Sequence, residues 1–215
     1  MIQQMKQTKK LLGKLPSVFE NKFPSPGIVL TKGGPKVGVY VASELGFSYA
    51  GRYFLENYVH PKLEELGAFI FDPFRLCGEY LTPKMFDKTR SAKSLEKDWK
   101  KFGEVVIPTV DYELLIPKSG LMFAICEGSS VDEGMAAEMA FMATNFGPVI
   151  AVRSDFRLGE SLAAGTNFAV SHFASRRYFG GSYHENSKKD LAYESAFKAM
   201  KEIIDKKLKE WGKSK

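Results

Sequence analysis

Four short, continuous apolar runs constrain the fold more than any other feature of this sequence. They occupy residues 37–43 (VGVYVAS), 68–74 (AFIFDPF), 121–126 (LMFAIC) and 148–152 (PVIAV). The runs do not alternate polar and apolar residues as a half-exposed strand does, so they fit the buried interior of a parallel sheet. Strands of this kind alternating with helices predict helices on both faces of the sheet.

The segments between the runs carry the helical signals. Apolar spacing and breakers predict helices at residues 49–66, 94–102, 105–120, 135–146 and 190–211. Pro61 predicts a kink or a late start in the first of these, and Gly67 is expected to end it. A weaker strand is expected near residues 177–179. The pattern predicts a flavodoxin-like α/β fold, with a parallel sheet of about five strands and helices on both faces.

Length and charge suit one α/β domain with a basic N-terminal extension. The chain has 215 residues and a formal net charge of +6. We expect residues 1–35 to form the extension, because the breakers PSPG (24–27) and KGGP (32–35) disfavour continuous regular structure. Residues 36–215 would form the domain. The positive charge suits solvated helix faces or an anionic partner, but no nucleic-acid-binding motif accompanies it.

Several classes of protein are excluded by missing signals in the sequence. No apolar run approaches the roughly 20 residues that span a bilayer, and the N-terminus lacks the features of a secretory signal. The chain has only two cysteines, Cys77 and Cys126, so we expect neither a disulfide framework nor a zinc site. We also expect the protein to be cytoplasmic. The phosphate-binding loops G-x-G-x-x-G and G-x-x-x-x-G-K-[ST] and the nucleophile elbow G-x-S-x-G are absent. The three histidines lack ligand-like spacing, so we expect no metal and no organic cofactor.

Two carboxylates follow the third apolar run and are the strongest candidates for chemistry. Asp132 precedes a predicted helix, where it would cap free backbone N–H groups. Glu138 lies further along the same helix among Ala and Met residues, where a buried carboxylate costs free energy unless something uses it. A carboxylate beside an apolar wall can act as a nucleophile toward a sugar carbon. Ligands of parallel sheets bind at the carboxyl ends of the strands, so Tyr40 and Asp72 are expected near the same crevice.

The segments VGVYVAS, FIFDPF and CEGSSVDEGMAAEMAFM, with VIAVRSDFR, resemble the nucleoside 2-deoxyribosyltransferase family. The resemblance covers roughly residues 37–74 and 119–200, and its specific part is the acidic segment on the loop and helix after a central strand. It implies that Glu138 is the nucleophile and that Asp132 binds a sugar hydroxyl. It also implies that Tyr40 orients the nucleophile and that Asn167, in GTNFAV, enters the site of a neighbouring subunit.

The resemblance further implies a substrate-binding set and leaves one role unassigned. The set comprises Ser43, Phe47, Asp72, Gly134 and Asn167. The family usually has an Asp just before the central strand, where this chain has Ser119 and Gly120. Asp111 lies at least seven residues upstream and Asp72 belongs to another strand, so the sequence does not assign the proton donor to the departing base.

We therefore expect transfer of 2-deoxyribose between nucleobases, with a 2′-deoxynucleoside and a free nucleobase as partners. The enzyme would need no cofactor and would be a homo-oligomer with sites shared between subunits. The first alternative is a nucleotide N-glycoside hydrolase with a 5′-phosphate site, for which Ser129 and Ser130 are available. The second is a non-catalytic nucleotide-sensing domain.

Overall fold

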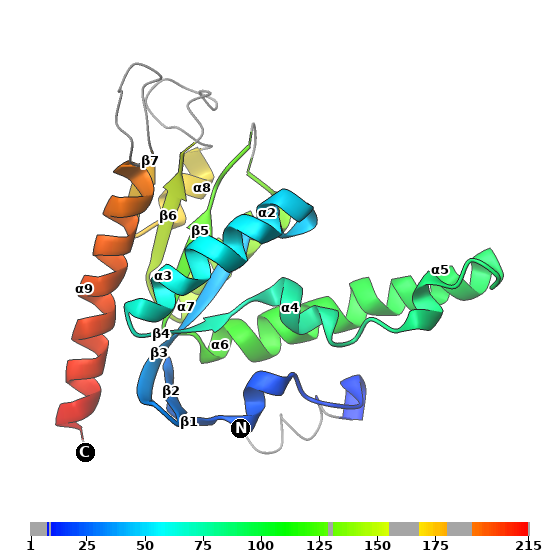
Figure 1. The fold of residues 1–215 in the computed structure, drawn as a ribbon, viewed down its shortest axis with the longest axis horizontal. Coiled ribbons are helices and arrows are strands. Elements are labelled where there is room, and N and C mark those ends of the chain that lie inside the picture. Colours follow the sequence, from blue (N-terminus) through cyan, green and yellow to red (C-terminus); the bar gives the residue numbers. More distant parts are fainter. Residues whose placement is uncertain (1–7, 9, 129–130, 155–167, 180–190, 215) are drawn as a thin grey trace.

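The computed structural model describes residues 8, 10–128, 131–154, 168–179 and 191–214 (Figure 1). Within these residues, one seven-stranded sheet forms the centre of the molecule. Its strands are β1 Lys22–Ser25, β2 Ile28–Thr31, β3 Gly34–Ser43, β4 Ala68–Phe71, β5 Leu121–Ile125, β6 Val149–Arg153 and β7 Arg176–Phe179. The four apolar runs and the weaker strand of the sequence analysis thus appear as β3 to β7.

The sheet is parallel across five strands, in the order β4–β3–β5–β6–β7. From β3, the chain passes to β4 on one side and later returns to β5 on the other. In open α/β sheets, ligands bind where the strand order reverses in this way, beside the carboxyl ends of the strands. The topology therefore places a binding crevice at the carboxyl ends of β3 and β5, as the α/β prediction requires.

Part of the predicted N-terminal extension belongs to the sheet. β1 and β2 form an antiparallel hairpin, and β2 pairs in turn with the start of β3. Gly27 adopts φ +76°, and a Cβ there would lie 2.5 Å from the Cα of Gly120, so only glycine fits this turn. The breakers interrupt regular structure here, as predicted, but the short strands between them were not expected. Pro and Gly form the tight turns that join such antiparallel strands. The boundary drawn at residues 35 and 36 falls within β3.

Two helical layers cover the sheet. One face packs against α9 Leu191–Lys213 and against a continuous helix made of α2 Tyr49–Phe54, a π-helical segment Leu55–Val59 and α3 His60–Glu65. The other face packs against α4 Pro73–Gly78, α7 Glu133–Asn145 and α8 Phe168–Phe173, and against the inner part of the long helix described next. Strand residues alternate between these layers: Val39 and Val41 face the first, and Tyr40 and Ala42 face the second.

Residues 92–118 form one long helix, where the sequence predicted two. α5 Ala92–Lys101 continues through π-helical segments Phe102–Val106 and Thr109–Leu115 into α6 Ile116–Lys118. Pro108 lacks an N–H and would clash in a regular turn, and the N–H of Ile107 bonds to the carbonyl oxygen of Phe102 in a wider turn. The proline is thereby accommodated without a break. A π-helical segment also precedes Pro61, where a kink was expected.

Within the part of the chain that the structure describes, no helix combines the length and apolarity required to cross a membrane.

Candidate active site

The centre of the candidate site is a hydrogen bond between Tyr40 and Glu138. The Tyr40 hydroxyl donates to Oε1 of Glu138 at 2.8 Å, across 98 residues of sequence. Tyr40 is fully buried on β3, and Glu138 is half-buried on α7. The alternation of β3 turns Tyr40 toward α7, while its neighbours Val39 and Val41 pack on the opposite layer. The pairing predicted for these two residues is present.

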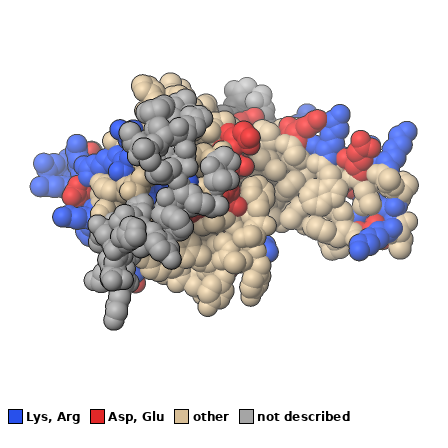
Figure 2. All heavy atoms as spheres, turned by 90° about the horizontal axis from the view of Figure 1, so that it is seen from above, with Lys and Arg blue, Asp and Glu red and all other residues tan. Residues whose placement is uncertain are grey.

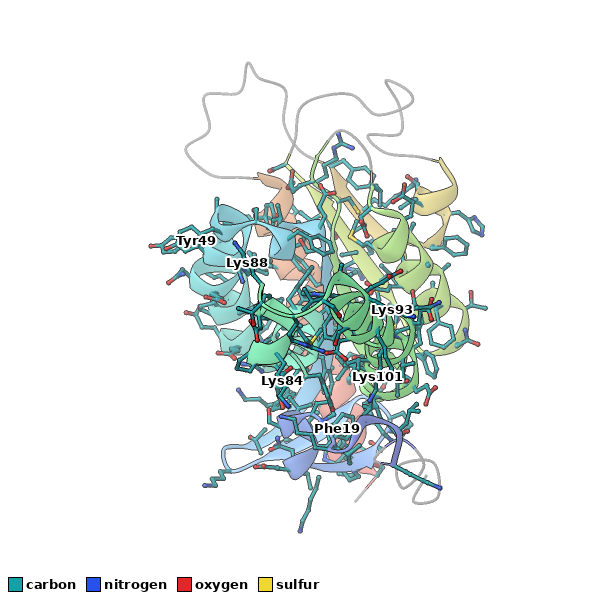
Figure 3. All side chains as sticks on the ribbon, turned by 90° about the vertical axis from the view of Figure 1, so that its right-hand side faces the viewer. Phe19, Tyr49, Lys84, Lys88, Lys93 and Lys101 are labelled. Atoms are coloured by element: carbon teal, nitrogen blue, oxygen red, sulfur yellow. The ribbon has the colours of Figure 1, made fainter. Side chains whose placement is uncertain are left out.

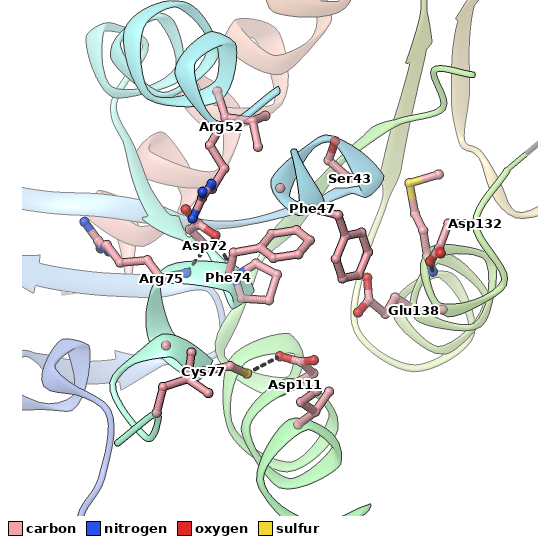
Figure 4. Close-up of a pocket in the computed structure, with 18 of the residues that line it drawn as sticks. Ser43, Phe47, Arg52, Asp72, Phe74, Arg75, Cys77, Asp111, Asp132 and Glu138 are labelled. Atoms are coloured by element: carbon pink, nitrogen blue, oxygen red, sulfur yellow. Dashed lines mark hydrogen bonds between the residues drawn. The ribbon is translucent and has the colours of Figure 1, made fainter. Parts of the chain in front are cut away.

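A cavity of about 530 Å³ opens beside Glu138. It lies where the loops after β3, β4 and β5 meet, and this volume is in the range of small-molecule sites. Of the predicted residues it is lined by Ser43, Phe47, Asp72, Asp132, Gly134 and Glu138. Figure 4 shows Asp132 and Glu138 at one side, with Arg52, Asp72 and Arg75 at the other. Residues far apart in the sequence thus share one concave surface.

Asp132 combines the capping role with a place in the cavity. Its Oδ2 accepts a hydrogen bond from the backbone N–H of Met135 at 2.9 Å, which caps the first turn of α7. A carboxylate offers several acceptor positions, so one oxygen can cap the helix while the group still meets a ligand. Gly134, in the same turn, also lines the cavity, and a Cβ there would lie 3.0 Å from Oδ2 of Asp132. The structure therefore supports the capping interpretation without removing Asp132 from the site.

Ser43 and Asp72 also hold local structure at the edge of the cavity. The Ser43 hydroxyl accepts from the N–H of Leu45 at 3.1 Å and caps the 3-10 turn Glu44–Phe47. Oδ1 of Asp72 accepts from the N–H groups of Phe74 and Arg75 at 2.9 and 3.2 Å, at the start of α4. Both residues line the cavity through the turns that they stabilise.

Two aromatic rings form an apolar wall of the cavity. Phe47 is 78% exposed, and its ring meets Phe74 edge to face at a centroid distance of 4.9 Å. Such pairs are the common arrangement of aromatic side chains, and they present flat apolar surface to a planar ligand. Phe47 thus lines the cavity, and its role in binding a substrate stays a prediction.

Asp111 is the carboxylate that the sequence left unassigned. It lies in the π-helical segment Thr109–Leu115, is only 3% exposed and lines the cavity. Its Oδ1 lies 3.8 Å from the Sγ of Cys77, which can donate a weak hydrogen bond (Figure 4). The sequence signal was an acid inside the apolar run VVIPTVDYELLIP. The sequence did not show that residues 109–115 are π-helical, and this wider turn changes the direction in which the Asp111 side chain points. Such π-helical turns are frequent at functional sites.

Burial perturbs the titration of this group of residues. Loss of solvation raises the pKa of Asp111 to about 7, and the hydrogen bond from Cys77 partly opposes this shift. Loss of solvation, followed by repulsion from Asp111, raises the pKa of Glu138 to about 8. Burial also raises the pKa of Tyr40 well above its usual value. The phenol therefore stays protonated and can donate its hydrogen bond to Glu138. Carboxyls that repel each other titrate as a pair, so near neutral pH these two hold at least one proton.

The acidic group does not form a metal site in the described part of the chain. No cluster of three or more His, Cys, Asp and Glu side chains there has the arrangement that could hold a metal ion. Both cysteines are free and buried. His60 lies 3.9 Å from Oδ2 of Asp72, and burial, the largest influence, lowers its pKa. The predicted residue Asn167 and the loop residues Ser129 and Ser130 lie outside the described residues.

No protein-family model and no curated protein matches the chain. Among solved structures, a conserved protein from Enterococcus faecalis V583 is 19% identical, with a TM-score of 0.49 over 80% of this chain and 99% of that one. A 2-desoxiribosyltransferase from Leishmania mexicana is 16% identical, with a TM-score of 0.41 over 78% of this chain and 98% of that one. A 2-deoxyribosyltransferase from Bacillus psychrosaccharolyticus is 16% identical, with a TM-score of 0.39 over 73% of this chain and 95% of that one. Similarities this distant assign no activity.

Proposed function

We propose that this protein transfers 2-deoxyribose from one nucleobase to another through a covalent ester on Glu138. The observation that carries the proposal is a half-buried carboxylate held by a buried tyrosine hydroxyl at 2.8 Å, with a second buried carboxyl in the same cavity. One ionised and one protonated carboxyl are the groups that double displacement at a glycosidic carbon requires. The acidic sequence motif that resembles the nucleoside 2-deoxyribosyltransferases supports the same assignment.

In the first step, an oxygen of ionised Glu138 forms a bond to the anomeric carbon of the deoxynucleoside. The N-glycosidic bond breaks, and its electron pair leaves with the base nitrogen, which takes a proton from Asp111. The two carboxyls titrate as a pair, and we assign the reaction to the form in which the shared proton lies on Asp111. Only this form offers both an ionised nucleophile and an acid for the departing base, and the hydrogen that Tyr40 donates to Glu138 favours it. The Tyr40 hydroxyl fixes the carboxylate and stabilises its charge until attack.

In the second step, a nitrogen of the incoming base attacks the anomeric carbon and displaces Glu138. The proton released by that nitrogen returns to Asp111, so the enzyme ends in its starting state with net retention at the sugar. Asp132 binds a sugar hydroxyl with the part of its carboxylate that does not cap α7. A 2′-hydroxyl would crowd the nucleophile, so deoxyribose is the preferred sugar. Asn167 stays a proposed contribution from a neighbouring subunit of a homo-oligomer.

Incubation with deoxyinosine and adenine tests the proposal. Chromatography should reveal deoxyadenosine and hypoxanthine, with little free deoxyribose. Free deoxyribose without deoxyadenosine would show hydrolysis in place of transfer. Recovery of both starting compounds unchanged would refute the proposal and favour a non-catalytic nucleotide-binding domain.

A second candidate is hydrolysis of a 2′-deoxynucleoside 5′-monophosphate. The observation that favours it is that Arg52 and Arg75 line the cavity, and neither guanidinium forms an ion pair with another described residue. Guanidinium groups bind phosphate through paired hydrogen bonds. Release of deoxyribose 5-phosphate from a deoxynucleotide, with no exchange of bases on deoxyinosine, would favour this candidate over transfer.

A further inference from the structure

One wall of the cavity belongs to a helical arm that projects from the body of the molecule. We define the arm as residues 79–106, which include α5 and the 3-10 turn Pro83–Phe86. None of the residues of α5 is fully buried. Figures 1 and 2 show the arm extending to one side of the sheet, and Figure 3 shows Lys84, Lys88, Lys93 and Lys101 on and around it. The arm therefore contributes little to the core, and its role is best inferred from the side chains that it contributes to the cavity wall.

The arm presents a fixed aromatic surface to the cavity. Leu81, Trp99 and Phe102 are among the cavity-lining residues. The Trp99 indole Nε1 donates to the carbonyl oxygen of Met85 at 3.1 Å, and the ring meets Phe86 and Phe102 edge to face at 5.6 and 5.9 Å. The indole is thus held in one orientation although it is 41% exposed. A large apolar surface left in water at a cavity wall is typical of a ligand-binding surface.

This aromatic surface lies well away from the reacting carboxyls. Trp99 and Asp111 belong to the same continuous helix, twelve residues apart, which corresponds to roughly 15–18 Å along its axis. Side chains of a helix tilt toward its N-terminus, so the Trp99 ring reaches further out still. Phe102 and Ile107 line the cavity between them. A purine that exchanges its proton with Asp111 would leave the part of the cavity beside Trp99 unfilled.

We propose that the cavity takes nucleobases that carry an apolar substituent, and that Trp99 and Leu81 bind this substituent. The inference rests on the proposed function, because that function places the base beside Asp111. The glycosidic nitrogen of a purine lies on its five-membered ring, so a group on carbon 6 points away from the sugar and toward the arm. An apolar group there would cover the exposed face of the indole and release the water beside it.

Isothermal titration of the wild-type protein with free bases tests this without any chemistry. Adenine and N6-benzyladenine are the probes, because they differ only in one apolar group. We expect N6-benzyladenine to bind about tenfold more tightly or better, which is the discrimination that an apolar pocket gives to added hydrocarbon. Equal binding of the two bases, or tighter binding of adenine, would overturn the proposal.

Variants of the arm localise the effect. Trp99→Ala should bring the ratio of the two affinities close to one, and Leu81→Ala should lower it. Tyr53→Ala is the matched control, since Tyr53 is an exposed aromatic residue outside the cavity lining, and the ratio should not change. If circular dichroism showed that Trp99→Ala loses helix, Leu81→Ala would decide, and an unchanged ratio in it would refute the assignment.

Base exchange, measured in parallel, separates this inference from the proposed function. Preferential binding of N6-benzyladenine without any exchange from deoxyinosine would refute deoxyribosyl transfer and leave the arm assignment standing. Exchange from deoxyinosine with no preference between the two bases would refute the arm assignment and leave transfer standing.

Discussion

Replacing Asp111 by Asn should make the stability of the protein less sensitive to a rise in pH from about 5 to about 8. In the folded protein, burial raises the pKa of Asp111 from the ordinary 3.8 to about 7. A carboxyl with a raised pKa stabilises the fold fully only below its unfolded pKa, and this contribution is lost as the pH rises through the folded value. The asparagine amide would keep the shape and the hydrogen-bonding capacity of the side chain but could not ionise. The variant should therefore keep the stability that the wild type loses.

The magnitude follows from the pKa shift. Between the unfolded and the folded pKa, each pH unit lowers the free energy of unfolding by about 1.4 kcal/mol. From about pH 5 to about pH 8, ionisation of Asp111 should therefore lower the free energy of unfolding of the wild type by about 3 kcal/mol. Asp111 is almost wholly buried, so solvent screens little of this cost. Urea unfolding of both proteins at the two pH values measures the difference. Between the two pH values, the free energy of unfolding of Asp111→Asn should fall by about 3 kcal/mol less than that of the wild type.

A matched control separates this effect from a general change in charge. Glu113 lies two residues further along the same helix and is exposed, so Glu113→Gln should follow the wild type at both pH values. If Asp111→Asn lost as much stability as the wild type between the two pH values, Asp111 would not be a buried ionisable group. The variant should also transfer deoxyribose much more slowly, because it has no proton to give to the departing base.

Three further outcomes test the assignments of the site. Glu138→Ala should lower base exchange by several orders of magnitude while circular dichroism stays native, since it removes the covalent nucleophile; near-normal turnover in a folded variant would exclude Glu138. Asp132→Asn should keep the cap of α7 and reduce exchange, whereas Asp132→Ala should also lower stability by about 1 kcal/mol in urea unfolding; full activity in Asp132→Asn would leave capping as its one role. Inosine should react much more slowly than deoxyinosine at equal concentration, and equal rates by chromatography would contradict a deoxyribosyl site.

The sequence predicted structure correctly where a few neighbouring residues decide it. Continuous apolar runs such as LMFAIC and PVIAV became buried parallel strands, because only a strand covered on both faces tolerates so few polar residues. Gly67 ended its helix with φ +97°, as a glycine at that position predicts. The acidic segment made Asp132 and Glu138 the candidates for chemistry, and both line the cavity, where Glu138 accepts a hydrogen bond from Tyr40. The hairpin at residues 22–31 was missed, because the breakers that signal a loop are also those of tight turns.

What the sequence by itself determined was the order of the five parallel strands along the chain and the residue types available at their carboxyl ends. Only the tertiary structure decided which of those residues meet. The sequence left the role of Asp111 unassigned because Asp111 lies well upstream of β5, yet the long helix and its π-helical turns bring it into the cavity with Cys77 and Glu138. The physical reason is that a raised pKa comes from desolvation and neighbouring charge. Both depend on distances between segments far apart in the chain, and such distances exist only once the two layers have packed on the sheet.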